Sequence, residues 1–264
     1  VGVTEKLVPF MGILYVLLAV VVIVMHLDMI PPVLVEIFSD AFNFQKILAG
    51  IGGSCMMYGI KRGLYSNEAG VGSAPNAAAA ADVAHPAQQG LVQMLSVFID
   101  TVLCTATAFM CMFSGVIPTK EMAGAPYVQA AVQVDFGAVG PILITVAMVL
   151  FAFTTLIGNL FYVDNCLNYL NHSKTPGKSF MTLYRIIAVL VIFVGAGMTM
   201  DNAWAAADIT MAFMCLVNIP SIMALSNTAL KVMDDYGRQL KEGKKPVFKA
   251  KDIDLDTSNL DYWK

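Results

Sequence analysis

The sequence predicts an all-α polytopic membrane protein with about six transmembrane helices, one of them broken at mid-membrane. Hydrophobic residues make up 58% of the 264 residues and charged residues only 13%, where a soluble domain carries about 25% charged residues. Several apolar runs are long enough to span a bilayer. One run is interrupted by polar residues and glycines, and such a break survives at membrane depth only where protein or a water-filled cavity satisfies the backbone.

Composition also excludes several functional classes. The net charge of −3, without a basic cluster that includes aromatic residues, argues against a nucleic-acid partner. The five cysteines form no CxxC pair and lie in or beside apolar segments, which favours buried reduced thiols over metal ligands. The chain has no P-loop, HExxH motif or GxSxG elbow, so we expect neither an enzyme nor a cofactor. An intramembrane hydrolase built on Asp100 or Asp208 would need a second, paired acid that no motif supplies.

The first predicted span covers residues 7–26, a dense run of Leu, Val and Ile that stops at residues 28–32. Residues 33–44 are typical of a short amphipathic interfacial helix. His26 and Asp28 at the end of the span have two interpretations, surface hydration or a role in proton coupling. The sequence opens with neither Met nor a signal-peptide pattern, so we interpret it as a piece of a longer protein.

The second span is the interrupted one. Its first half is predicted at residues 46–63, the break at 66–72 and the second half at 73–82. Ser73 is a suitable N-cap and Pro75 fits the first turn of the second half. A kink without function is the alternative interpretation. A kink needs only Pro or Gly, however, and this stretch also carries polar and charged residues.

The third span is predicted at residues 89–116 and carries Asp100 inside an apolar run. An ionisable residue in a membrane helix is a functional candidate by default, and structural pairing with a neighbouring helix is the alternative. Residues 117–138 form a connection that is long for a plain loop. Its apolar residues fit one face of a short re-entrant or interfacial helix.

The fourth span, residues 140–167, has Thr154 and Thr155 near its centre. Viewed on the helix alone, these hydroxyls either bond back to the preceding turn or ligate an ion. The fifth span is predicted at 183–200 and the sixth at 204–230.

The spans divide the chain into a transmembrane domain at residues 1–230 and a hydrophilic tail at 231–264. Most basic residues outside the spans fall on one side of the membrane if six spans alternate. The positive-inside rule puts this side, and with it the tail, in the cytoplasm.

Four stretches in consistent order resemble one family of transporters. They are SNEAGVGSAPNAAA at 66–79, EKLVPFM at 5–11, HPAQQGLVQ on to FIDT within 85–101, and FAFTTLIGN at 151–159. Each is similar to a stretch of the sodium:alanine symporter family, the alanine or glycine:cation symporters. The resemblance covers nearly all of residues 4–230.

The resemblance implies a leucine-transporter-type fold, with two five-helix repeats of inverted topology and a broken first helix in each. The chain would be the C-terminal portion only, namely the last helix of the first repeat and the whole second repeat. Residues 117–138 would be an extracellular gate segment. The missing N-terminal helices of the same protein would supply the other broken helix, with a Gly-Thr-Gly-Asn-like stretch.

The break itself has a chemical consequence. Carbonyls at the end of its first half, residues 65–68, can bind an ammonium group. N–H groups at residues 72–74 favour a carboxylate, and a zwitterionic amino acid needs both. The predicted substrate-binding residues are Tyr65, Asn67, Glu68, Gly70, Gly72, Ser73, Asn159 and Tyr162. Glu68 either orients the unwound backbone or contacts the substrate amine.

The resemblance also implies that Thr154 and Thr155 ligate sodium. Many family members carry Trp where this chain has Asn159, and the smaller residue leaves room for a substrate larger or more polar than alanine. The acidic residue that follows the paired aromatics in the family is Asp164 here.

The implied function is sodium-coupled symport of a small neutral amino acid by alternating access. Alanine or glycine is the expected substrate, extending to serine or glutamine, and sodium the coupling ion. We expect a multi-pass protein of the plasma membrane of a bacterium or archaeon. The alternatives are an ion channel with the glycine-rich stretch as its filter, a proton-coupled amino-acid transporter, or an inert fragment that lacks half of the site.

Overall fold

The computed structural model describes residues 2–42, 51–67, 70–119, 122–171 and 176–255, together with residues 257, 260 and 263. All regular secondary structure in these residues is helical, which confirms the predicted all-α class. The chain divides into two compact units. Unit 1 comprises residues 1–67 and 98–161, and unit 2 comprises residues 68–97 and 162–264.

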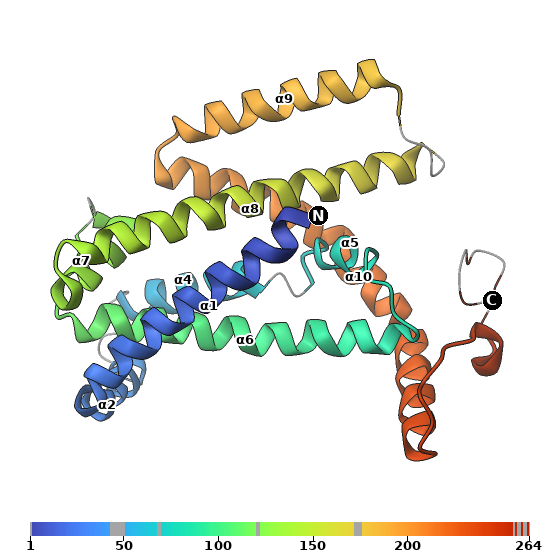
Figure 1. Ribbon diagram of the computed structural model, residues 1–264, viewed down its shortest axis with the longest axis horizontal. Helices are drawn as coiled ribbons and strands as arrows, with labels where there is room; N and C mark the ends of the chain where they lie inside the picture. The colour runs from blue at the N-terminus through green and yellow to red at the C-terminus, as the bar shows by residue number, and fades with distance from the viewer. Residues whose placement is uncertain are drawn as a thin grey trace. The chain divides into compact units, whose positions relative to one another are not determined.

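Five helices in the described part of the chain are long and apolar enough to cross a membrane. They are α1 (Gly2–Met25), α6 (Pro86–Phe113), α8 (Val139–Leu170), α9 (Lys178–Ala196) and α10 (Met200–Lys241) (Figure 1). They correspond to the five uninterrupted spans predicted from the sequence, and their length and composition fit a polytopic membrane protein. Large apolar side chains are exposed along each of them, as expected for helices that face lipid.

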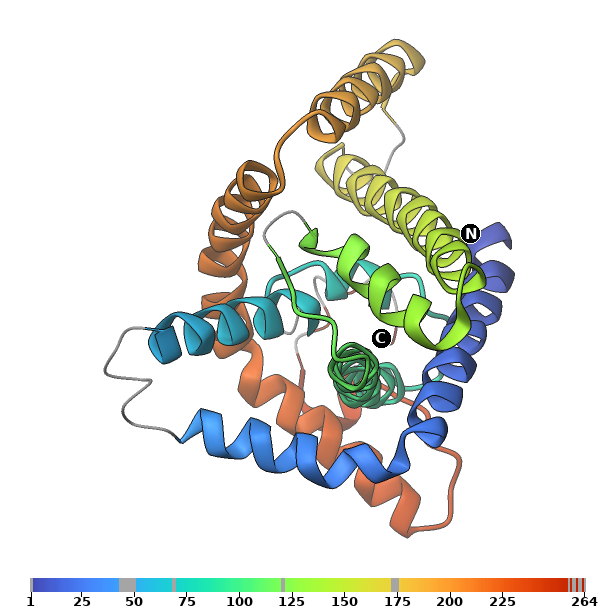
Figure 2. The same ribbon diagram turned by 90° about the vertical axis from the view of Figure 1, so that its left-hand side faces the viewer.

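In unit 1, α1 leads through a single 3₁₀ turn, η1 (Leu27–Met29), into the short helix α2 (Ile30–Ala41). Figure 2 shows α2 turning sharply away from α1. Pro31 and Pro32 were expected only to end the first span. They also fill the first turn of α2, where a residue without an N–H loses no intrahelical hydrogen bond. The short helix predicted at residues 33–44 therefore exists and begins earlier than expected, and its place at the membrane interface stays a prediction.

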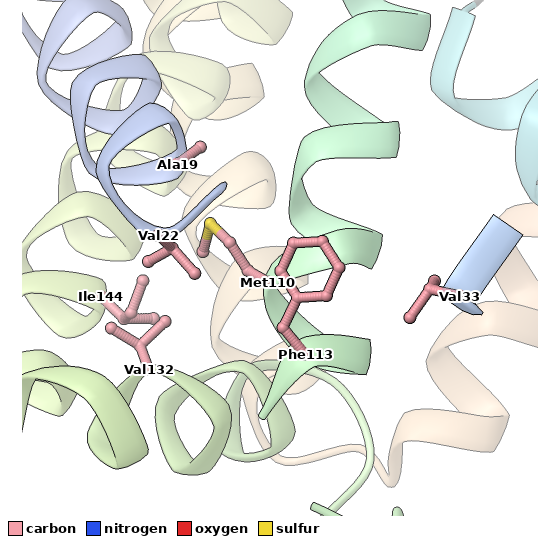
Figure 3. Packing of buried hydrophobic residues seen from close by; sticks show 7 residues of the cluster. All are labelled: Ala19, Val22, Val33, Met110, Phe113, Val132 and Ile144. Carbon is pink, nitrogen blue, oxygen red and sulfur yellow. The ribbon is translucent and has the colours of Figure 1, made fainter. Parts of the chain in front are cut away.

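The connection at 117–138 contains the expected short helix, α7 (Ala125–Phe136), with Ala131 and Val132 buried. Val132 belongs to an apolar cluster to which α1, α2, α6, α7 and α8 each contribute (Figure 3). Its members are Ala19, Val22, Val33, Met110, Phe113, Val132 and Ile144. Burial of this cluster holds α7 against three of the spans.

His26 lies next to this cluster and corrects the surface-hydration interpretation. Its Nε2 lies 3.5 Å from Asp135 Oδ1 of α7, and its Nδ1 lies 3.1 Å from the Val22 carbonyl. The ring also stacks on Phe113, with centroids 5.7 Å apart. His26 therefore ties the end of α1 to α7.

In unit 2, α10 runs without interruption past the predicted boundary at residue 230 and ends at Lys241. Charged and polar side chains one turn apart support this extension. Arg238 pairs with Asp235, and Gln239 Nε2 donates to Asp235 Oδ2 at 2.8 Å. The fall in hydropathy marks the end of the apolar surface, whereas the helix continues as a charged one. The chain then turns back along the extension and forms η3 (Ala250–Ile253) (Figure 1).

Candidate functional site

The interrupted segment consists of α4 (Ile51–Asn67), a turn described from Gly70 to Ser73, and α5 (Ala74–Ala78). The predicted break is confirmed, and α5 begins directly after the predicted N-cap Ser73, but the first edge of the break and the end of the second half are wrong. The helix continues through Ser66 and Asn67, which the sequence assigned to the break. The second half was predicted to reach residue 82 and ends at Ala78, so the later alanines lie outside the helix. Residues 46–50 of the predicted first half lie outside the described residues.

Two glycines make this turn possible. Gly70 has φ +95° and Gly72 has φ +118°, a backbone region that side-chain-bearing residues rarely adopt. A Cβ atom added to Gly72 would lie 3.2 Å from both Cβ and Cγ of Asn218. Gly72 is therefore required both for its backbone conformation and for the close approach of α10.

Asn218 of α10 holds the turn, and the sequence interpretation assigned it no role. Its Nδ2 donates to the Gly70 carbonyl at 2.9 Å, so it satisfies a backbone group that the break releases from helical hydrogen bonding. The available signal was an amide inside an apolar span, a residue type that in a membrane helix usually finds a specific partner. One sequence cannot show which partner that is.

Replacing Asn218 with Ala is expected to weaken the turn. The substitution leaves the Gly70 carbonyl without its donor, at a cost of about 1 to 3 kcal/mol. We expect a lower melting temperature of the purified full-length protein and a several-fold lower uptake rate. Asn202→Ala is the matched control, because Asn202 is exposed at the start of the same helix. Equal melting temperatures for the two variants would contradict this role of Asn218.

The inner half of the segment is attached to α6 and α8. Gln93 Nε2 of α6 donates to the Ala74 carbonyl at 3.1 Å, and the Cys166 thiol of α8 donates to Asn76 Oδ1 at 3.7 Å. Ser73 is buried and immediately precedes α5, but its side chain makes no capping hydrogen bond. The predicted N-cap is thus correct in position and wrong in chemistry. Cys104, Cys111, Cys166 and Cys215 are free thiols, but of these only Cys111 is buried, and the predicted burial is wrong for the exposed Cys104 and Cys166.

The predicted residues on the outer half are only partly described. Tyr65 is half-buried in the last turn of α4, with the Arg62 guanidinium 5.9 Å from its ring centroid. Glu68 lies outside the described residues, as does the side chain of Asn67. The carbonyl end that the sequence places at residues 65–68 therefore stays a prediction, because it includes Glu68.

Asp100 of α6 has a partner on α4. The Ser66 hydroxyl lies 2.8 and 3.0 Å from the two carboxylate oxygens of Asp100 and donates its one hydrogen to them. Cys104 Sγ lies 3.6 Å from the same hydroxyl. This pairing favours the structural interpretation of Asp100, and it ties α6 to the last turn before the break.

The two threonines of α8 differ in their surroundings. Thr154 is buried, and its hydroxyl donates to the Leu150 and Phe151 carbonyls at 3.0 and 3.1 Å. Thr155 is exposed. Back-bonding uses the hydroxyl hydrogen and leaves oxygen lone pairs free. The two interpretations of Thr154 are therefore compatible.

The predicted substrate residues on α8 follow the threonines along the helix. Asn159 is exposed and lies one turn beyond Thr155, on the same face of α8. Tyr162 follows almost one turn later and is half-buried. Thr155 and Asn159 therefore present an oxygen and an amide on one stripe of the helix.

Further along α8 and on α9, three buried polar atoms have no hydrogen-bond partner among the described residues. They are Asp164 Oδ1, Asn168 Oδ1 and the Tyr184 hydroxyl oxygen. Asp164 and Asn168 are one turn apart on the same face of α8. Each of these oxygens can accept a hydrogen bond from water.

Comparison with known proteins gives a consistent result. A family model described as the sodium:alanine symporter family matches residues 1–250. The chain is 41% identical over 254 residues to the amino-acid carrier protein AlsT of Bacillus subtilis, covering 96% of the chain and 53% of that protein. It is 38% identical over 274 residues to a sodium/proton-dependent alanine carrier protein of Bacillus sp. PS3, covering 98% and 61%.

A third relative is the sodium/alanine symporter AgcS of Methanococcus maripaludis, 37% identical over 231 residues, covering 86% of the chain and 50% of that protein. The chain thus spans about half the length of the curated relatives it matches. These shares do not say which part of each relative is matched, so the C-terminal placement stays a prediction. No solved structure matches the chain significantly.

Proposed function

The chain belongs to the sodium:alanine symporter family, and from this premise we propose that the whole protein carries a small neutral amino acid across the plasma membrane together with sodium. The family consists of transporters, in line with the expectation that the chain is not an enzyme. Alanine is the first candidate substrate, because two of the relatives are named for it. Glycine is the other candidate that the family resemblance implies, and serine and glutamine are further candidates because Asn159 leaves room beside the substrate.

One observation supports this proposal above the others, namely that the family match includes an apolar segment broken at Gly70–Ser73 and held open by Asn218. A break of this kind exposes backbone carbonyls and N–H groups at membrane depth, where they can bind a charged substrate. α4 supplies the carbonyls for the ammonium group. α5 has only five residues, so its dipole is small, and the N–H groups of the turn carry most of the carboxylate binding.

We place the coupling ion at Thr154 and Thr155, and the substrate at the break together with Asn159 and Tyr162. Sodium is a hard cation that takes oxygen ligands, and threonine hydroxyls supply them without a fixed charge. In the proposed mechanism, sodium binding orders the broken helices, and the affinity for the amino acid rises as a result. Alternating access in a leucine-transporter-type arrangement of inverted repeats then releases both ligands inside.

The test is uptake of labelled alanine by proteoliposomes that contain the full-length protein, with and without an inward sodium gradient. Saturable uptake that needs the gradient is expected. A proton gradient alone, imposed at equal sodium, separates sodium coupling from proton coupling. Competition by unlabelled glycine, serine and glutamine ranks the substrates. Uptake that is independent of sodium would overturn the proposal, and downhill conduction that does not saturate would favour the channel alternative.

We also propose that the C-terminal tail lies in the cytoplasm, because most of the basic residues outside the spans fall on its side of the membrane. A single cysteine introduced at Lys245, which is exposed, should react with a membrane-impermeant maleimide only after the cells are permeabilised. A cysteine at Val139, exposed at the start of α8, is the opposite-side control. Labelling of Lys245→Cys in intact cells would reverse the proposed orientation.

A further inference from the structure

His85 has no accessible surface, although it lies in a short connection between α5 and α6. Its Nε2 lies 3.3 Å from Asp235 Oδ2 of α10, and the side chains of both residues are fully buried. Asp235 also pairs with Arg238, and it accepts a hydrogen bond from Gln239. A buried carboxylate with three partners is a specific polar network, because each of its hydrogen bonds offsets part of the cost of burying the charge.

The neighbours of His85 fix which ring nitrogen carries the hydrogen. The backbone N–H of Ala87 can only donate, and it points to His85 Nδ1 at 3.2 Å. Nδ1 is therefore the acceptor, and Nε2 carries the hydrogen that it donates to Asp235. Both ring nitrogens are satisfied in this tautomer, so His85 links the start of α6 to the end of α10.

The C-terminal tail closes over this pair. The Phe248 ring meets His85 edge-on with centroids 5.1 Å apart, and Tyr236 does so from α10 at 5.0 Å. The backbone N–H of Phe248 donates to the Ala84 carbonyl at 3.0 Å. Gln239 exchanges two hydrogen bonds with Val247, at 3.0 and 3.1 Å. Side chains from the connection, from α10 and from the tail thus form one cluster, called the node here, whose members are His85, Asp235, Tyr236, Gln239 and Phe248.

The segment from Gly70 to His85 is therefore attached to α10 at both of its ends. Asn218 holds its beginning through the Gly70 carbonyl, and Asp235 holds its end through His85. The two anchors lie 17 residues apart on one continuous helix, which is about 25 Å at 1.5 Å per residue. Because the segment that contains α5 is bound to α10 at both of its ends, it has little freedom to hinge against α10.

We propose that His85 is a positioning residue that fixes the inner half of the broken segment to α10, so that residues 70–85 and α10 move as one body during transport. The proposal rests on the proposed function and specifies which elements move together. It assigns the hydrophilic extension of α10 and the returning tail a role in the transport cycle, as the frame that holds the inner half-helix.

Two substitutions separate the two hydrogen bonds of His85. The amide of His85→Asn reaches the position of Nδ1 and keeps the acceptor for Ala87, but it loses the donor to Asp235. The amide of His85→Gln reaches the position of Nε2 and keeps that donor. In proteoliposomes of the full-length protein, we expect His85→Asn to lower the maximal rate of sodium-driven alanine uptake about 10-fold. The KM for alanine should stay within about two-fold, since the binding residues are intact.

His85→Gln should keep at least about half of the rate, because it retains the charge-assisted hydrogen bond. Glu242→Gln is the control, since it removes an exposed ion pair with Lys244 outside the node, and it should behave as the unsubstituted protein. Equal losses in the Asn and Gln variants, or no loss in the Asn variant, would overturn the proposal.

A distance measurement tests the proposal without relying on uptake. Spin labels at Asp82→Cys and Asp234→Cys, both exposed, report on the connection and on α10 in a background without the native cysteines. We expect one distance distribution whether sodium and alanine are absent or present, and a broader one in the His85→Asn variant. A shift on adding sodium and alanine to the protein with His85 would show that the segment hinges against α10, and would overturn the proposal. If this protein shows no sodium-driven uptake, the proposed function fails, whereas an effect of His85→Asn on the distances still shows that His85 holds the segment.

Discussion

Replacing Gly72 with alanine is expected to reduce uptake by about 10-fold or more. At φ +118° a side-chain-bearing residue is strained by about 1 to 3 kcal/mol. The new Cβ would also lie 3.2 Å from two carbon atoms of Asn218. To relieve the strain or the crowding, the turn has to move away from α10. This movement disturbs the hydrogen bond from Asn218 to the Gly70 carbonyl. The measurement is the initial rate of alanine uptake per reconstituted protein, together with the melting temperature.

Two further glycines make this prediction specific. Gly70 also has positive φ, but among the described residues a Cβ there meets only Ile219 Cγ1, at 3.9 Å. Gly70→Ala therefore isolates backbone strain and should have a smaller effect. Gly90 lies in α6, and a Cβ there meets no atom of the part of the chain that the structure describes within 4 Å. Gly90→Ala should be neutral or stabilise the helix by about 1 kcal/mol. If Gly72→Ala transports as well as Gly90→Ala, the turn is not part of the working site.

The spans could be predicted because the sequence signal for each span lies within a single helix. A long apolar run predicts a membrane helix without reference to any neighbour. The position of the break was predictable for the same reason, since Gly70 and Gly72 permit conformations that other residues avoid. The first end of the break was not. Ser66 and Asn67 stay helical, and Ser66 hydrogen-bonds to Asp100, a contact that depends on how two helices pack.

The residues that hold the site together were missed for a related reason. Asn218 and His85 each act through a partner far away in the sequence, Gly70 and Asp235 respectively. Local patterns carry no information on such pairs. The alanines after Ala78 were assigned wrongly for the same reason, because contacts that are distant in the sequence decide their conformation. Their high helix propensity is a weak preference that tertiary contacts override, and here the chain leaves the helix to place His85 against Asp235.

The two threonines of α8 lead to the remaining prediction. Adjacent residues on a helix point about 100° apart, so a cation that binds both oxygens must lie between the two directions. Thr154 is held rigid, since its hydroxyl donates to two backbone carbonyls, and its lone pairs have a fixed direction. Thr155 is exposed and is free to turn its hydroxyl oxygen toward a bound ion. Thr155 is therefore the cleaner residue to substitute, because its removal opens no buried cavity.

Thr155→Ala is expected to raise the sodium concentration for half-maximal uptake about 10-fold, as loss of one interaction with a charged group costs about 1.5 to 3 kcal/mol. The maximal rate at saturating sodium should change much less, because the ion still binds through its other ligands. Thr155→Ser keeps the oxygen and should retain the original sodium dependence. Thr105→Ala is the matched control, since Thr105 is an exposed threonine of α6 whose hydroxyl donates back to the Thr101 carbonyl. An unchanged sodium dependence in Thr155→Ala, or an equal shift in Thr105→Ala, would remove Thr155 from the ion site and leave sodium to be bound elsewhere.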